Sequence, residues 1–220
     1  INLSYGHKSN SLQSSLQPLG RIENLMTIQL SSKAALVDRV VPRSAVNDVA
    51  LVLAGAVVTA YAAQLVIPMW PVPITAQTLA VLLVGSVLGA TRGAISLLTY
   101  FSMGAVGLPV FSAASTLSFG PTFGYLVGFV AAAAVVGYLA ERGWHKTVSG
   151  VIASFAIANS VIYLFGLPWL AVALGSLGAA NDFASVAAAG LVPFMIGDAL
   201  KMALAAALLP LAWKFLGKKA

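Results

Sequence analysis

The segment from Leu191 to Trp213 is almost entirely apolar, yet it contains one acidic and one basic residue, Asp198 and Lys201. It is long enough for a helix to cross the roughly 30 Å hydrocarbon core of a membrane. A charge near the middle of such a helix costs about 2.5–3.5 kcal/mol on insertion scales. At this spacing both side chains point to one face of the helix, which must therefore turn toward protein or a water-filled cavity.

This charged pair has two interpretations. Asp198 and Lys201 could neutralise each other and lock the packing of helices, in which case apolar residues would replace them at little cost. Alternatively they belong to a binding site or an ion path, which is the usual role of ionisable groups at membrane depth. We favour the second interpretation.

The composition indicates an all-α integral membrane protein. Of the 220 residues, 60% are hydrophobic and 8% are charged, whereas soluble domains have about 25% charged residues. The chain is too short to add a nucleotide-hydrolysing domain and has no GxxxxGK[ST] phosphate loop, so any ATP dependence would come from a partner. It has no cysteine, and both histidines, His7 and His145, lie in polar stretches. We therefore expect no metal site, no cofactor and no enzymatic activity.

Apolar stretches alternate with turn signals and predict about six transmembrane helices. The predicted helices cover residues 45–67, 75–90, 94–106, 124–139, 148–165 and 191–213. Proline- and glycine-rich connections fill 68–74, 107–123 and 166–190, and part of the last could form a short surface helix. Residues 1–44 are polar, and we expect them to be a disordered extension before a membrane domain of residues 45–220.

The charged residues predict the orientation. With alternating spans, one side of the membrane receives nearly all basic residues outside the helices, namely Lys33, Arg39, Arg43, Arg92, Arg142, Lys146, Lys214, Lys218 and Lys219. The opposite loops receive only Asp182. Because basic loops face the cytoplasm, we expect both termini inside and a multi-pass protein of a prokaryotic plasma membrane. This asymmetry explains the net charge of +6 without a nucleic-acid partner.

The three irregular connections all fall on the outer side, where they predict a ligand pocket above the charged pair. Side chains available to it are Trp70, Gln77, Phe111, Tyr125, Tyr163 and Trp169. For the tryptophans, anchoring at the membrane interface is an equal alternative. Gln77 could instead bond a neighbouring helix, and for Asn159 such packing is the favoured interpretation. Arg92 is interpreted as a cytoplasmic anchor.

A stripe of small residues in the first helix is a candidate docking surface. Ala56, Ala60 and Ala63 lie within about 60° of one another around the helix axis. Small residues let another helix approach closely. The partner could be another membrane protein, although packing within the chain is the simpler alternative.

Several motifs together resemble the BioY family, the biotin-binding S components of energy-coupling factor (ECF) vitamin transporters. They are PMWPVPITAQTLAVLLVGSVLGATRGAISLLTYFSMGAVGLPVF, GPTFGYLVGF, YLFGLPWL and GDALK, in an order that covers about residues 46–215. One departure is Phe123, where the family often has glycine, and it affects only the details of that loop.

This resemblance implies a six-helix S component that binds biotin from outside. Its partners would be a transmembrane coupling protein and a pair of ABC-type ATPases. The small-residue stripe of the first helix is similar to the surface that the family uses against the coupling protein. The family's GD-x-x-K residues, implicated in biotin recognition, correspond to Asp198 and Lys201. Their chemistry suits a ureido ring and a carboxylate tail, but which residue meets which end stays open. Aromatic and aliphatic walls would bury the bicyclic body of biotin.

Two other functions stay open. The chain could be an S component for a different small vitamin-like molecule. It could also be a solitary proton-coupled carrier in which Asp198 titrates as the relay. A membrane enzyme is disfavoured because no cluster of histidine, serine and carboxylate residues reaches the membrane face together.

Overall fold

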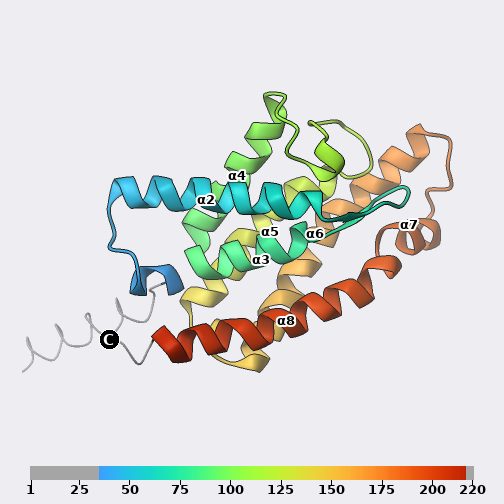
Figure 1. The fold of residues 1–220 in the computed structure, drawn as a ribbon. Helices are drawn as coiled ribbons and strands as arrows, with labels where there is room; N and C mark the ends of the chain where they lie inside the picture. The colour runs from blue at the N-terminus through green and yellow to red at the C-terminus, as the bar shows by residue number, and fades with distance from the viewer. Residues whose placement is uncertain (1–34, 217–220) are drawn as a thin grey trace, which may run out of the picture. The chain divides into compact units, whose positions relative to one another are not determined.

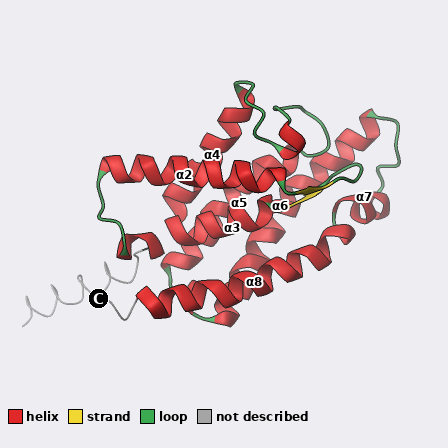
Figure 2. Cartoon of the chain, in the orientation of Figure 1, coloured by secondary structure: helices red, strands yellow, loops and turns green. Residues whose placement is uncertain are grey.

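The computed structural model describes residues 35–216 as a mostly helical unit (Figures 1 and 2). Its α-helices are α2 (Ala45–Gln64), α3 (Gln77–Leu88), α4 (Ala90–Ala105), α5 (Phe123–Glu141), α6 (Val148–Ser176), α7 (Phe183–Gly190) and α8 (Val192–Leu216). Short 3-10 turns are η1 (Leu36–Arg39), η2 (Ser112–Ala114) and η3 (Trp144–Lys146). Strands β1 (Val66–Ile67) and β2 (Ile74–Thr75) pair antiparallel between α2 and α3.

Helix α5 lies at the centre and packs against α3, α4 and α6. Small side chains make this possible, since Ala132 and Ala133 are fully buried and let neighbouring helices approach closely. At Gly85 of α3, an added Cβ would lie 2.6 Å from the carbonyl oxygen of Ala133, so only glycine fits. Helix α2 packs on α3 and α4, while α8 packs on α6, α7 and α3.

Four of the described helices, α2, α5, α6 and α8, are long and apolar enough to cross a membrane. Helices α3 and α4 correspond to two further predicted spans, but they have only 12 and 16 residues. The structure thus agrees with the predicted all-α membrane fold.

The prediction that residues 166–190 form a loop is wrong. Helix α6 continues to Ser176 with Pro168 inside it, and α7 occupies part of the remainder. A proline inside a helix removes one backbone hydrogen bond and costs about 3 kcal/mol. Here the extra turns bury Leu170 and Leu174, which offsets that cost. The short helix that was expected within part of this region is present, as α7.

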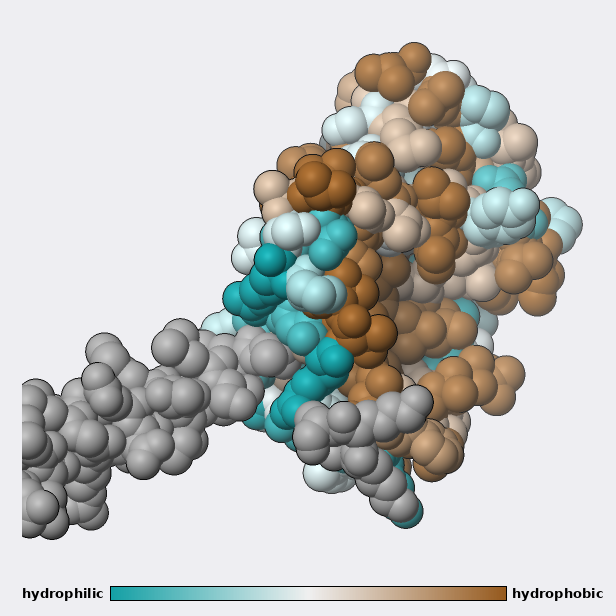
Figure 3. Space-filling model, turned by 60° about the vertical axis from the view of Figure 1, so that its left-hand side comes forward, coloured by the Kyte–Doolittle hydropathy of each residue, from teal (hydrophilic) through white to brown (hydrophobic). Residues whose placement is uncertain are grey.

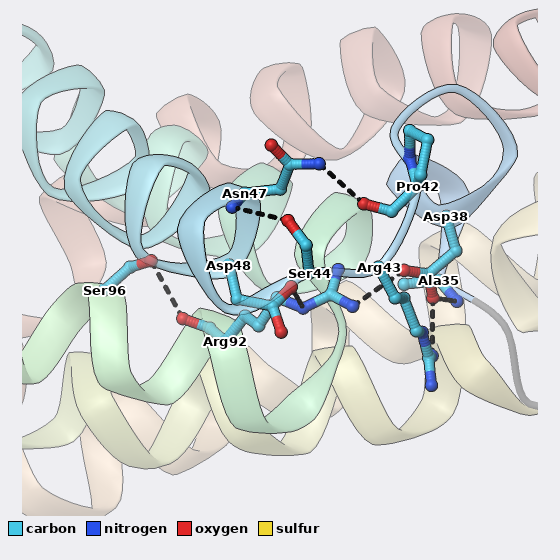
Figure 4. Close-up of polar contacts among 9 residues, drawn as sticks. All are labelled: Ala35, Asp38, Pro42, Arg43, Ser44, Asn47, Asp48, Arg92 and Ser96. Atoms are coloured by element: carbon cyan, nitrogen blue, oxygen red, sulfur yellow. Dashed lines mark hydrogen bonds and ion pairs between the residues drawn. The ribbon is translucent and has the colours of Figure 1, made fainter.

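The helical unit begins earlier than residue 45. Leu36 and Val37 are buried, and Asp38 forms ion pairs of 2.7 Å with both Arg43 and Arg92 (Figure 4). Arg92 also contacts Asp48 of α2 at 3.1 Å. Burial alone would raise the pKa of Asp38, but the two guanidinium groups together hold it below the ordinary value. Residues 1–34 of the predicted extension lie outside the described part of the chain.

Most of the described charged side chains gather at one end of the unit. Figure 3 shows a hydrophilic band there and a largely hydrophobic surface beyond it. This end holds the start of α2, the turn between α3 and α4, and the connection between α5 and α6, where Ala90 N–H donates to Glu141. Near the end of α8, Trp213 stacks on His145 of η3 and lies under the cationic groups of Arg39 and Lys146. Arg92 of α4 pairs with Asp38 of η1 and with Asp48 of α2, so it joins three segments in addition to its predicted role as an anchor.

Candidate ligand-binding site

A cavity with an open mouth lies at the end opposite the charged band. Its walls come from the start of α3, the start of α5, the middle of α6 and the first half of α8. The loop of residues 106–122, between α4 and α5, covers it and is called the roof loop below. The lining is Val72, Pro73, Thr75, Gln77, Thr78, Phe111, Ser112, Ser115, Thr116, Ser118, Thr122, Tyr125, Leu126, Phe129, Asn159, Ile162, Tyr163, Phe194, Asp198 and Lys201.

Asp198 and Lys201 both line this cavity, on one face of α8. Their charged atoms are 3.5 Å apart, and their side chains are only 9% and 16% exposed. Each has a second partner from another helix. The Tyr163 hydroxyl of α6 donates to Asp198 Oδ2 at 2.5 Å, and Lys201 Nζ donates to Thr78 Oγ1 of α3 at 2.7 Å. The pair is thus held in place by α3 and α6 and still faces an open space.

A second polar network runs from the cavity into the helices. The Gln77 amide donates to the Tyr100 hydroxyl at 2.6 Å, and that hydroxyl donates to the Val110 carbonyl at 3.2 Å. The Thr75 hydroxyl donates to Gln77 Oε1 at 3.1 Å. Gln77 of α3 thus bonds Tyr100 of α4, which is the contact between helices that was predicted as the alternative to ligand binding. Its side chain also borders the cavity.

The roof loop is folded around Phe111, whose ring is 3% exposed and packs edge-on against Tyr100. The next turn contains Ala113 and Ala114, with φ of 55° and 53°. This left-handed conformation costs a residue other than glycine about 1–2 kcal/mol. The Gln64 side chain, at the end of α2, bonds this turn. It donates to the carbonyls of Val110 and Phe111 and accepts from Ala114 N–H at 2.9 Å.

The cavity brings together six of the seven binding residues predicted from the sequence, and Asn159 as well. Trp70 is the exception, since it is 69% exposed and outside the lining. Trp169 is also outside the lining, and its indole N–H donates to the Gly120 carbonyl of the roof loop at 3.0 Å. Among residues 35–216, no group of three or more His, Asp or Glu residues could hold a metal ion.

The predicted docking stripe requires correction. Ala56 and Ala63 are fully buried within the chain, and Ala60 is partly buried. Ala56 and Ala63 therefore serve the packing of α2 on its neighbours and are closed to a partner, whereas Ala60 borders a groove at the surface. The exposed face of α2 carries larger apolar side chains instead, such as Val57, Val58 and Tyr61.

Comparison with known proteins gives the family. The model of the BioY family matches residues 30–218. The chain belongs to the BioY family. Related family members include the biotin transporter BioY of Rhizobium etli, 41% identical over a match that covers 63% of this chain and 76% of the relative. The probable biotin transporter BioY of Pyrococcus horikoshii is 34% identical, with coverage of 72% and 91%.

A solved structure shares the BioY fold seen here. It is the 2.1 Å crystal structure of the S component for biotin from an ECF-type ABC transporter, with a TM-score of 0.65 and 20% identity. The match covers 77% of this chain and 92% of that one. At this level of identity, the likeness is one of fold.

Sequence reasoning missed several residues at the site of this BioY member. Thr78 precedes an apolar run and gives no signal of contact with Lys201, which is distant in sequence. Tyr100 lies in an apolar stretch and is typical of a core residue. Gln64, near the end of the first predicted helix, was visible as a polar residue, but its partners are backbone groups of a loop whose path the sequence does not reveal.

Proposed function

We propose that this protein is the high-affinity biotin-binding subunit of an ECF-type vitamin uptake transporter. The observation that carries the proposal is the pairing of Asp198 with Lys201 inside a cavity that has both polar and apolar walls, in a chain whose relatives are named biotin transporters. In such a transporter, partner subunits hydrolyse ATP, and this chain supplies recognition.

The lining suits the chemistry of biotin. Asp198 can accept hydrogen bonds from the two ureido N–H groups, or Lys201 can pair with the carboxylate tail. Phe111, Tyr125 and Phe194 supply apolar surface for the bicyclic body. The two charged groups are paired with each other, and each also has a polar partner on another helix, so binding would add contacts without first exposing a bare charge.

The charge distribution supports an orientation. The described basic residues that do not line the cavity lie at the opposite end of the unit, in its helix ends and turns. They are Arg39, Arg43, Arg92, Arg142, Lys146 and Lys214. Basic ends face the cytoplasm, so the cavity would open near the outer face of a prokaryotic plasma membrane. Six spans with both termini inside complete this arrangement, with α3 and α4 as the two short spans.

The partners would be a transmembrane coupling protein, ABC-type ATPase subunits and the surrounding lipid. With Ala56 and Ala63 buried, the exposed apolar face of α2 is the better candidate on that helix for the coupling protein.

Ligand identification tests this function. Protein purified in detergent from cells grown in rich medium should carry biotin, identified by mass spectrometry, and should rebind it after removal. Another vitamin-like molecule in its place would indicate a different S component. Uptake by vesicles containing only this chain, abolished by an uncoupler and indifferent to ATP, would instead favour a solitary carrier.

A further inference from the structure

We infer that Gln64 is a positioning residue that holds the roof loop closed over the ligand and so sets the rate at which the ligand leaves. This inference rests on the proposed function, because it concerns the same cavity. Gln64 itself is not among the residues that line the cavity, so it acts through the roof loop.

The first argument is the set of contacts that Gln64 makes. Its Nε2 lies 3.3 Å from the Val110 carbonyl oxygen and 3.1 Å from that of Phe111, and its Oε1 accepts from Ala114 N–H at 2.9 Å. The same Nε2 lies 3.0 Å from the Ala60 carbonyl oxygen in its own helix, so its two N–H groups are shared among three carbonyls and the side chain is fixed relative to α2. One amide therefore connects a transmembrane helix to both sides of a tight turn.

The second argument is that this turn needs support. Ala113 and Ala114 are both left-handed, a conformation that glycine adopts freely and alanine does not. Within the loop, the turn is closed by Phe111 N–H donating to the Ser115 carbonyl at 3.0 Å. Without Gln64, the two alanines would gain by returning to ordinary backbone angles, and the turn would open.

The third argument is what the turn carries. Phe111, Ser112 and Ser115 face the cavity. The Val110 carbonyl that Gln64 bonds also accepts from Tyr100, which is bonded by Gln77 at the cavity wall. Opening the turn would therefore move part of the roof and loosen one wall. The effect should fall mainly on ligand dissociation, since an open roof removes the barrier to exit.

The experiment compares the full chain with Gln64→Ala, Gln64→Glu and the pair Ala113→Gly/Ala114→Gly, the last both alone and combined with Gln64→Ala. Gln64→Glu keeps the acceptor for Ala114 N–H but loses the donor to the two carbonyls. Asn47→Ala is the matched control, because Asn47 also joins α2 to a preceding loop, through the Pro42 carbonyl, but at the other end of the helix.

Two quantities are measured, biotin dissociation and hydrogen exchange of residues 108–118 in the ligand-free protein. We expect Gln64→Ala and Gln64→Glu to speed dissociation about tenfold and to raise exchange in the turn, with Asn47→Ala unchanged. The glycine pair should slow dissociation of the Gln64→Ala protein at least about threefold, since glycine holds the turn without the amide. A merely structural role of Gln64 in α2 would show no such rescue.

Dissociation and exchange within about twofold of the parent in both Gln64 variants would overturn the inference, as would failure of the glycine pair to rescue. Loss of folded protein in both variants would also overturn it, because Gln64 would then be needed by the whole fold. If the parent chain itself does not bind biotin, the proposed function fails, and the exchange measurement still shows whether Gln64 holds the turn.

Discussion

The Tyr163 hydroxyl donates a hydrogen bond of 2.5 Å to the Asp198 carboxylate at the wall of the cavity, which joins the middle of α6 to the first half of α8. Lys201 lies on the other side of the same carboxylate at 3.5 Å. The carboxylate is therefore fixed between a neutral donor and a cation, and both of its neighbours also border the cavity. This arrangement explains how an apolar helix tolerates the charged pair at the wall of a cavity.

Removing either charge should abolish most ligand binding. Asp198→Asn and Lys201→Met should each weaken biotin binding roughly 10- to 100-fold, the range for losing a hydrogen bond to a charged group. Titration calorimetry of the purified variants measures this effect. Lys214→Met, in the last turn of the same helix, should bind like the parent. Unchanged affinity in both cavity variants would show that the pair serves packing alone.

The Tyr163 hydroxyl should contribute separately. Tyr163→Phe removes one donor to Asp198 but keeps the ring, so we expect affinity to fall about 3- to 10-fold, less than after loss of the carboxylate charge. Tyr138→Phe makes the same chemical change at an exposed position of α5 and should have no effect. A loss at Tyr163→Phe as large as that at Asp198→Asn would contradict a supporting role.

Gly104 should be required for the shape of the roof. An added Cβ there would overlap the Phe111 ring, so Gly104→Ala should displace Phe111 and weaken biotin binding several-fold. Gly197→Ala is the control, since a Cβ at that helical position meets no atom within 4 Å although it adjoins Asp198. Equal binding by both variants would mean that Phe111 does not shape the site.

The Arg92 network should stabilise the fold without contributing to recognition. Arg92→Met leaves Asp38 and Asp48 without a shared partner and should lower the free energy of unfolding by about 2–3 kcal/mol. This is less than for a fully buried pair, because Asp48 is 44% exposed. Thermal unfolding in detergent measures the change, with Arg142→Met as the control. Biotin affinity of the folded Arg92 variant should match the parent.

His145 should make the stability of the fold depend on pH. Burial, together with the charge of Lys146, lowers the pKa of His145 to about 4. Between the ordinary value of 6.5 and about 4, the unfolded chain therefore binds a proton that the folded chain does not. Stability should fall as the pH drops through this window. His145→Phe keeps a ring against Trp213 and should reduce this slope; an unchanged melting profile would contradict the assignment.

The sequence predicted most helices, because an apolar run long enough to cross a membrane favours a helix. It also predicted that the charged pair borders a cavity, because charges at membrane depth are costly unless they face protein or water. It failed where tertiary contacts outweigh local signals. The helix was predicted to end at residue 165, before a connection over 166–190, yet burial of Leu170 and Leu174 continues α6 to Ser176. The alanine stripe could not reveal which neighbour it faces, and Ala56 and Ala63 pack inside the chain. The partners of Gln64 and Lys201 depend on distant segments.

Titration of biotin into the purified ligand-free chain tests the central claim most directly. We expect saturable binding at one site, with a dissociation constant below about 1 μM that becomes roughly 10- to 100-fold weaker in Asp198→Asn. No saturable binding by the folded parent protein, or equally tight binding after loss of the Asp198 charge, would contradict the account.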